Sequence, residues 1–110
     1  MDARQAFIGL GSNLDDPVAQ LDRALAALDA GAGIRVAGVS SFYRTEPWGD
    51  TAQPAFVNAV ARLETSLSPE ALLDALVSIE TAAGRSRARR WGPRTLDLDL
   101  LVFDDLCSDD

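Results

Sequence analysis

The segment Leu96-Asp-Leu-Asp-Leu-Leu-Val-Phe103 decides the fold, because it alternates apolar and acidic side chains and then becomes apolar throughout. Side chains alternate between the two faces of a strand, so the even-numbered positions predict one continuous apolar face. The other face begins with Asp97 and Asp99 and continues with Leu101 and Phe103. A solvated face stays polar along its length. We therefore favour a largely buried strand with a polar site at its start over a strand with one wet face.

The two aspartates and the arginines before them predict a site for phosphate and a metal ion. Asp97 and Asp99 point to the same side of a strand, where their carboxylates can share a hard divalent ion such as Mg²⁺. Five of the ten basic residues, all of them arginines, fall between Arg85 and Arg94. Guanidinium groups bind phosphate oxygens through paired donors. Carboxylates beside arginines are typical of phosphoryl-type transfer, which depends on positioning and charge neutralisation.

The chain upstream of this segment predicts three more strands and two helices. The order β-α-β-β-α-β is typical of the α+β ferredoxin-like fold, an antiparallel sheet with two helices on one face. We expect one domain over residues 1–110. The predicted strands are Ala6–Leu10, Ile34–Tyr43 with Gly38 as a candidate bulge, Phe56–Leu63 and Leu96–Phe103, and the predicted helices begin at Asp16-Pro17 and Ser68-Pro69 and end near Gly31 and Gly84.

Composition excludes several classes of function. The 110 residues are 47% hydrophobic and carry a net charge of −7, which argues against a general nucleic-acid binder. Histidine is absent, which excludes histidine acid–base chemistry and the usual zinc ligand sets. The N-terminus lacks a signal peptide's pattern, and no apolar run is long enough to cross a bilayer. One cysteine, Cys107, forms no internal disulfide, so we expect a cytoplasmic protein.

The predicted topology brings distant segments to one edge of the sheet. The ends of the first two strands and the starts of the last two meet there, which gathers residues 11–13, 45–48 and 56–58 around the aspartates. The end of the second helix also brings Glu80 close. Phe56 and Asn58 alternate with the predicted core positions, so they project from the helix-free face.

These residues suit a flat heterocycle. An asparagine amide such as that of Asn58 offers a donor and an acceptor to a ring edge. Phe56 and Trp48 are aromatic side chains that can cover the ring. For each residue taken alone the alternative stays open, ordinary packing for the aromatics and a capping or loop hydrogen bond for the amide.

Gly9 and Gly11 follow a strand but do not form a dinucleotide-binding loop. Leu14 occupies the place of the third glycine, and the predicted topology differs from that of a Rossmann domain. We expect both glycines to serve tight-turn geometry.

Taken together, these motifs make the chain similar to the 6-hydroxymethyl-7,8-dihydropterin pyrophosphokinase family of folate biosynthesis. The last motif is highly specific, and the matching pieces keep the family's order over nearly the whole chain. They are Gly9-Leu-Gly-Ser-Asn-Leu14, Ser40-Ser-Phe-Tyr-Arg-Thr45, Phe56-Val-Asn58, Gly84-Arg85 and Arg90-Trp-Gly-Pro-Arg-Thr-Leu-Asp-Leu-Asp99.

The resemblance implies transfer of the β,γ-pyrophosphoryl group of ATP to the hydroxymethyl oxygen of the pterin, with release of AMP. It also implies roles for residues on both sides of the reaction. Asp97 and Asp99 would ligate two Mg²⁺ ions, and Arg85 and Arg94 would bind phosphates and stabilise the transferring charge. The remaining nucleotide contacts would come from Glu80, Arg87 and Trp91, and the pterin contacts from Thr45, Asn58 and Phe56, where similar enzymes often have tyrosine. Trp48 is expected at the ring from its aromatic side chain and not from the resemblance.

Similar enzymes continue beyond the last strand with a segment that carries a histidine, an arginine and a second aromatic residue for the ligands. Two alternatives to a pyrophosphokinase therefore stay open. One is a weak or inactive pterin- or nucleotide-binding module or fragment, and the other is a structural assembly domain. We also expect Leu101 and Phe103 to form an apolar patch on the helix-free face, and hence self-association or reduced stability of the monomer.

Overall fold

A five-stranded sheet and two helices make up the part of the chain that the computed structural model describes, residues 3–13, 16–46, 55–83 and 96–103. The predicted α+β order is confirmed, with the predicted second strand divided in two. The elements are β1 (Arg4–Ser12), α1 (Pro17–Ala30), β2 (Ile34–Val39), β3 (Tyr43–Thr45), β4 (Phe56–Thr65), α2 (Pro69–Ala82) and β5 (Asp97–Phe103).

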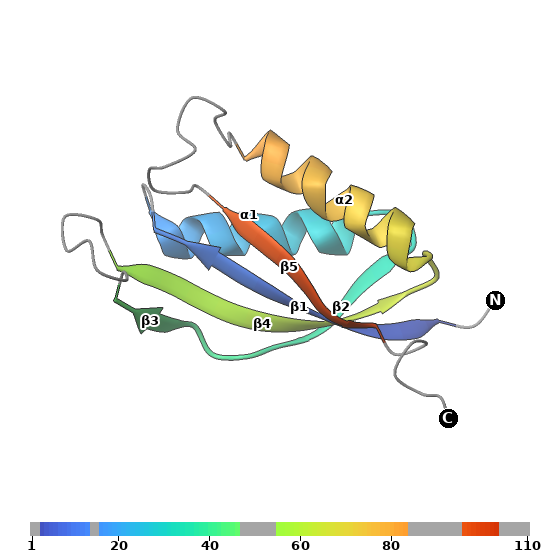
Figure 1. Cartoon of the computed structure of the whole chain (residues 1–110), viewed down its shortest axis with the longest axis horizontal. Coiled ribbons are helices and arrows are strands. Elements are labelled where there is room, and N and C mark those ends of the chain that lie inside the picture. Colours follow the sequence, from blue (N-terminus) through green and yellow to red (C-terminus); the bar gives the residue numbers. More distant parts are fainter. Residues whose placement is uncertain (1–2, 14–15, 47–54, 84–95, 104–110) are drawn as a thin grey trace.

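The strands lie in the order β2-β4-β1-β5, and the short strand β3 pairs with β4 beyond the end of β2. All neighbours are antiparallel, so β1 and β2 run in one direction and β4 and β5 in the other. Each helix connects two strands that have a third strand between them. Figure 1 shows both helices on the same side of the sheet, as the ferredoxin-like order requires.

Both helices begin where the sequence predicts. The Asp16 carboxylate accepts a hydrogen bond from the Ala19 N–H at 3.2 Å, and the Ser68 hydroxyl accepts one from the Ala71 N–H at 3.1 Å. Each cap is followed by a proline, whose fixed φ and missing N–H suit the first helical position. Gly33, after α1, has a φ of 81°, which glycine adopts without strain.

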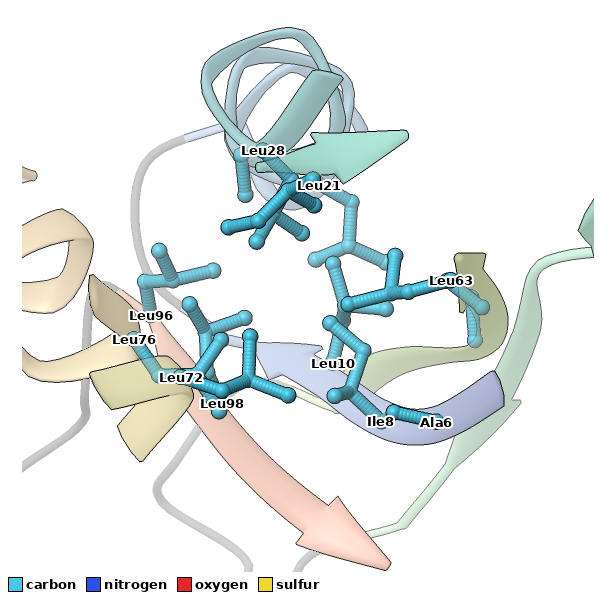
Figure 2. Packing of buried hydrophobic residues seen from close by; sticks show 14 of the residues in the cluster. Ala6, Ile8, Leu10, Leu21, Leu28, Leu63, Leu72, Leu76, Leu96 and Leu98 are labelled. Atoms are coloured by element: carbon cyan, nitrogen blue, oxygen red, sulfur yellow. The ribbon is translucent and has the colours of Figure 1, made fainter. Parts of the chain in front are cut away.

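One hydrophobic core fills the space between the helices and the sheet (Figure 2). The helices contribute stripes with helical spacing, and the strands contribute alternate residues. Among the described residues, neither helix has the length and apolar character that a membrane crossing needs. The buried apolar side chains include Leu21 and Leu28 of α1, Leu72 and Leu76 of α2, Ile8 and Leu10 of β1, Leu63 of β4 and Leu98 of β5.

The predicted strand over residues 34–43 is interrupted after Val39. Its register with β4 shifts between Val36 and Gly38, which confirms the bulge predicted there. The Ser40 N–H then donates to the Val60 carbonyl at 2.8 Å, and the Ser40 hydroxyl accepts from the Val60 N–H at 2.9 Å. The Ser40 side-chain oxygen takes the place of a backbone carbonyl as the acceptor. The Val60 N–H of β4 therefore keeps a hydrogen-bond partner where the chain leaves the strand pairing.

A second bulge, in β5, corrects the prediction for Phe103. The register with β1 pairs Leu100 with Ile8 but Val102 with Phe7, so Leu101 is an extra residue. The alternation of faces reverses there, and Phe103 enters the core with 3% of its surface exposed. Leu101 and Val102 remain 54% and 39% exposed. The apolar patch on the helix-free face therefore contains Val102 in place of Phe103.

Candidate functional site

A row of residues crosses the helix-free face of the sheet at the end where β1 and β3 finish and β4 and β5 begin. The strand register pairs Tyr43 with Asn58, Asn58 with Gly11, and Gly11 with Asp97. Directly paired residues of antiparallel strands share a face and lie about 5 Å apart at Cβ. The amide of Asn58 and the carboxylate of Asp97 therefore stand on either side of a residue that has no side chain.

The next row along the same strands repeats the arrangement. Val60 pairs with Gly9, and Gly9 pairs with Asp99. Asp97 is half-buried and Asp99 is exposed. This register places the two aspartates on the helix-free face together with Asn58. A strip of bare β1 backbone separates the two carboxylates from the β4 side chains.

The two glycines provide space rather than a turn. Both lie inside β1, and neither has the positive φ found among described residues at Gly33, so the tight-turn prediction was wrong. A Cβ added to Gly11 would lie 3.0 Å from the Asn58 Oδ1, closer than ordinary contact. One added to Gly9 would lie 3.7 Å from a Leu101 methyl group, an ordinary van der Waals distance. A side chain at position 11 would thus displace the Asn58 amide oxygen by a few tenths of an ångström, whereas one at position 9 would not crowd its neighbour.

A hydrogen bond that Asn58 donates to Thr45 orients the Asn58 amide. The Asn58 Nδ2 donates to the Thr45 Oγ1 at 2.9 Å, and this bond assigns the amide oxygen to the side over Gly11. The amide retains a second N–H and its oxygen for a further partner. Phe56 pairs with Thr45 on the same face and is half-buried. The predicted convergence of Thr45, Phe56 and Asn58 is confirmed as geometry.

Glu80 reaches the same region from the helix side. It lies in the last turn of α2, is 6% exposed, and its Oε2 accepts a hydrogen bond from the Leu98 N–H at 2.7 Å. Leu98 separates Asp97 from Asp99 in the sequence. The expectation that the end of α2 brings Glu80 to the site is confirmed, and its role toward a nucleotide stays a prediction.

The donor set at this edge suits Mg²⁺. Two carboxylates project from one face of β5 with a residue between them. Within residues 3–13, 16–46, 55–83 and 96–103, no cluster of three or more histidine, cysteine, aspartate or glutamate side chains forms a metal site of protein ligands alone. Mg²⁺ is commonly held by one or two carboxylates together with water and substrate phosphates. The pair therefore fits an ion that arrives with a phosphorylated ligand better than one enclosed by protein.

Five predicted site residues lie outside the described residues, and their roles stay predictions. They are Trp48, Arg85, Arg87, Trp91 and Arg94.

Sequence reasoning missed the part played by Gly11 and by Tyr43. Ile8 and Leu10 point into the core, so the two-residue period of a strand puts Gly11 on the helix-free face, where it pairs with Asn58. Tyr43 is 50% exposed and flanks Asn58 on β3. Its position depends on the interruption of the second strand, which the β-branched and aromatic composition of residues 34–43 did not reveal.

The family match and the named relatives indicate one family. Residues 7–107 match the family described as 7,8-dihydro-6-hydroxymethylpterin-pyrophosphokinase. A protein named 2-amino-4-hydroxy-6-hydroxymethyldihydropteridine pyrophosphokinase from Methylorubrum extorquens is 50% identical over 100 residues, which cover 91% of this chain and 63% of the relative. Proteins of the same name from Haemophilus influenzae and Pseudomonas putida are 53% and 50% identical, covering 89% and 92% of this chain.

The chain is shorter than each of these three relatives. It spans 61% of the length of the Haemophilus influenzae protein and 83% of that from Pseudomonas putida. A solved dinuclear metal-binding peptidase of the M20 family from Bacillus subtilis aligns at 16% identity with a TM-score of 0.49, covering 92% of this chain and 26% of that one, a likeness too weak to carry an argument. The family match and the identities near 50% over nine-tenths of the chain are decisive. The chain belongs to the 7,8-dihydro-6-hydroxymethylpterin-pyrophosphokinase family.

Proposed function

We propose that the chain transfers the pyrophosphoryl group of ATP to the hydroxymethyl group of 6-hydroxymethyl-7,8-dihydropterin. The observation that carries the proposal is the pairing of Asn58 and Asp97 across the bare backbone of Gly11 in a chain about 50% identical to proteins named for this reaction. The Asn58 amide would bind the pterin ring, and the Asp97 and Asp99 carboxylates would lie beside the phosphates of ATP. These groups lie on one face of the sheet, as a transfer between the two substrates requires.

The pterin side of the reaction is assigned to β3 and β4. The Asn58 amide, oriented by Thr45, offers an N–H and an oxygen to the edge of a pterin, which carries both acceptors and donors. Phe56 and Trp48 are proposed to contact the ring, and the absence of a side chain at Gly11 leaves room for it beside Asn58. An aromatic ring against a flat heterocycle contributes on the order of 1 kcal/mol beyond its buried area.

The phosphate side is assigned to β5 and the arginine-rich segment. In the proposed step the hydroxymethyl oxygen forms a bond to the β-phosphorus of ATP. The bond from that phosphorus to the α,β-bridging oxygen breaks, AMP leaves with the bridging oxygen, and the hydroxyl proton passes to water. Asp97 and Asp99 would hold Mg²⁺, which when bound neutralises phosphate charge, and Arg85 and Arg94 would stabilise the charge on the leaving oxygen. Two ions are proposed, as the family resemblance implies.

Glu80, Arg87 and Trp91 are proposed to act on the nucleotide side. A reaction of this kind depends on alignment of the attacking oxygen with the leaving oxygen, which such contacts supply.

A direct assay tests the proposal. The whole chain is incubated with ATP, Mg²⁺ and 6-hydroxymethyl-7,8-dihydropterin, and AMP and the pterin diphosphate are measured together. We expect equal amounts of both products, and a loss of at least about 10³-fold in the Asp97→Asn, Asp99→Asn double variant, a size seen when transition-state charge stabilisation is removed. The matched control is Asp22→Asn, an exposed carboxylate on α1, which should leave the rate unchanged.

A negative assay would favour the binding-module reading. Pterin or nucleotide that binds with no AMP formed above the double-variant blank would contradict catalysis by this chain alone. Failure to bind either ligand would contradict the binding-module reading as well.

Further properties belong to the same proposal. We infer a cytoplasmic location from the single cysteine, and ligands that are small molecules rather than nucleic acid from the net charge of −7. We also propose self-association through the helix-free face, where the exposed Leu101 and Val102 flank the half-buried Phe7.

A further inference from the structure

The backbone N–H between the two aspartates has a carboxylate partner from a helix. The Leu98 N–H donates to the Glu80 Oε2 at 2.7 Å, a distance typical of a charge-assisted hydrogen bond. Glu80 is 6% exposed, so this bond is shielded from water. Leu98 is flanked by Asp97 and Asp99, and any shift of its backbone moves both carboxylates.

The position of β5 in the sheet explains why such a partner matters. β1 pairs with β5 on one side, and β5 is the last strand in the order of the described sheet. An edge strand presents backbone groups that have no neighbouring strand to bind them. Glu80 supplies an acceptor at that outer edge, opposite the side on which Gly9 and Gly11 pair with the aspartates. The start of β5 is thereby held from both sides.

Local energetics do not favour a carboxylate at position 80. Glu80 lies in the last turn of α2, where the helix dipole is negative and no basic residue is present. Its burial also removes the carboxylate from water, which is unfavourable without hydrogen-bond donors. Residues that contradict local preference are expected at functional sites, where a tertiary contact compensates. The Leu98 N–H supplies such a contact to Glu80.

We propose that Glu80 is a positioning residue that fixes the β5 backbone and so sets the separation and direction of the Asp97 and Asp99 carboxylates toward a divalent cation. The inference rests on the proposed function, because it takes this pair as the cation ligands. It adds to the proposed place of Glu80 on the nucleotide side a contact with the protein backbone.

Two substitutions distinguish the effect of losing the hydrogen bond from the effect of losing the bulk of the Glu80 side chain. Glu80→Ala removes the acceptor, and removal of an outer partner of metal ligands typically lowers metal affinity by about 10–100-fold. Glu80→Gln keeps an oxygen acceptor of the same reach, so its affinity should stay within about threefold of the unchanged chain, in line with the modest net strength of one neutral hydrogen bond. Asp74→Asn, an exposed carboxylate on α2, is the matched control.

The test measures cation binding and the hydrogen bond separately. Mn²⁺ serves as the probe, and free Mn²⁺ is followed by electron paramagnetic resonance with the whole chain and α,β-methylene ATP. Amide hydrogen exchange at Leu98 is measured by NMR without metal or nucleotide, and a melting curve checks that each variant folds. Asp97→Asn establishes whether the Mn²⁺ is bound at the aspartate pair.

We expect Glu80→Ala to weaken Mn²⁺ binding at least tenfold and to speed exchange at Leu98, whereas Glu80→Gln and Asp74→Asn do neither. Unchanged Mn²⁺ affinity in a folded Glu80→Ala chain overturns the inference. If Glu80→Ala does not fold, Glu80→Asp takes its place, because it withdraws the carboxylate by one methylene, and unchanged affinity in that variant also overturns it. If Asp97→Asn leaves the Mn²⁺ affinity unchanged, the proposed metal site itself is overturned. That result is distinct from failure of the Glu80 inference alone.

Discussion

The helix-free face of the sheet has two ends of opposite character, although the same strands build both. At one end Asn58 and Asp97 flank the bare backbone of Gly11. At the other end Leu101 and Val102 lie exposed beside Phe7. The core face beneath is apolar over most of its length, and its buried polar residues Ser12 and Thr65 are the last residues of β1 and β4. A single sheet can thus keep one face for stability and divide the other between a polar site and an apolar patch.

Two backbone features produce the difference. Glycines at alternate positions of β1 remove side chains from the polar end, so that ligand groups can approach the backbone. The bulge at Leu101 reverses the alternation of β5 between the aspartates and the end of the strand. Without it, Phe103 would project from the helix-free face. The substitutions below test each feature.

The largest effect is expected at Phe103. Phe103→Ala should lower the free energy of unfolding by about 3–5 kcal/mol, because it removes a buried ring and leaves a cavity in the core. Leu101→Ala, on the exposed side of the bulge, should lower it by less than about 1 kcal/mol. Urea unfolding of both variants measures the difference. Equal losses would mean that the bulge does not separate these residues in solution.

A smaller effect is expected at the glycine beside Asn58. Gly11→Ala should reduce kcat/KM for the pterin by about 10–100-fold, because the new methyl group displaces an amide that must align with the ring. Gly9→Ala is the matched control, since its methyl group meets a Leu101 side chain at an ordinary distance. Steady-state kinetics with varied pterin gives both values. A Gly9→Ala loss as large as that of Gly11→Ala would contradict a specific contact with Asn58.

A still smaller effect is expected at Thr45. Thr45→Val removes the oxygen that accepts the hydrogen bond from Asn58, and a loss of about 1 kcal/mol should raise the pterin dissociation constant roughly fivefold. Thr45→Ser keeps the hydroxyl and should bind within about twofold of the unchanged chain. Isothermal titration with the pterin measures this. Equal weakening in both variants would point to the methyl group rather than to the hydrogen bond.

The smallest effect on the polar site is expected from a substitution at the apolar end of the face. Leu101→Ser should leave kcat/KM unchanged, and it should shift the chain toward monomer in sedimentation velocity if the patch mediates self-association. A monomer at all concentrations in the unchanged chain would contradict self-association. A loss of activity in Leu101→Ser would mean that the two ends of this face are coupled.

Much of the fold follows from the sequence because the periodic signals in it are strong and local. The caps at Asp16 and Ser68 and the alternation in β4 and β5 predicted the elements, and the β-α-β-β-α-β order then predicted the sheet. The same order predicted that Thr45, Asn58 and the aspartates meet at one edge. Chain order and side-chain period are enough for these conclusions, because both are properties of short segments.

Other features were decided only by the tertiary structure. The bulge at Leu101, the break at Ser40 and the space required at Gly11 each depend on a partner strand that is distant in the sequence. The bond from Leu98 to Glu80 joins a strand edge to a helix end 18 residues away. A local pattern specifies which way a side chain points, but the neighbour that it meets is specified by the packing of the whole sheet. For this reason the sequence determined the fold class and the edge of the sheet at which Thr45, Asn58 and the aspartates meet, and the tertiary structure determined their register, their spacing and the residues that hold them in place.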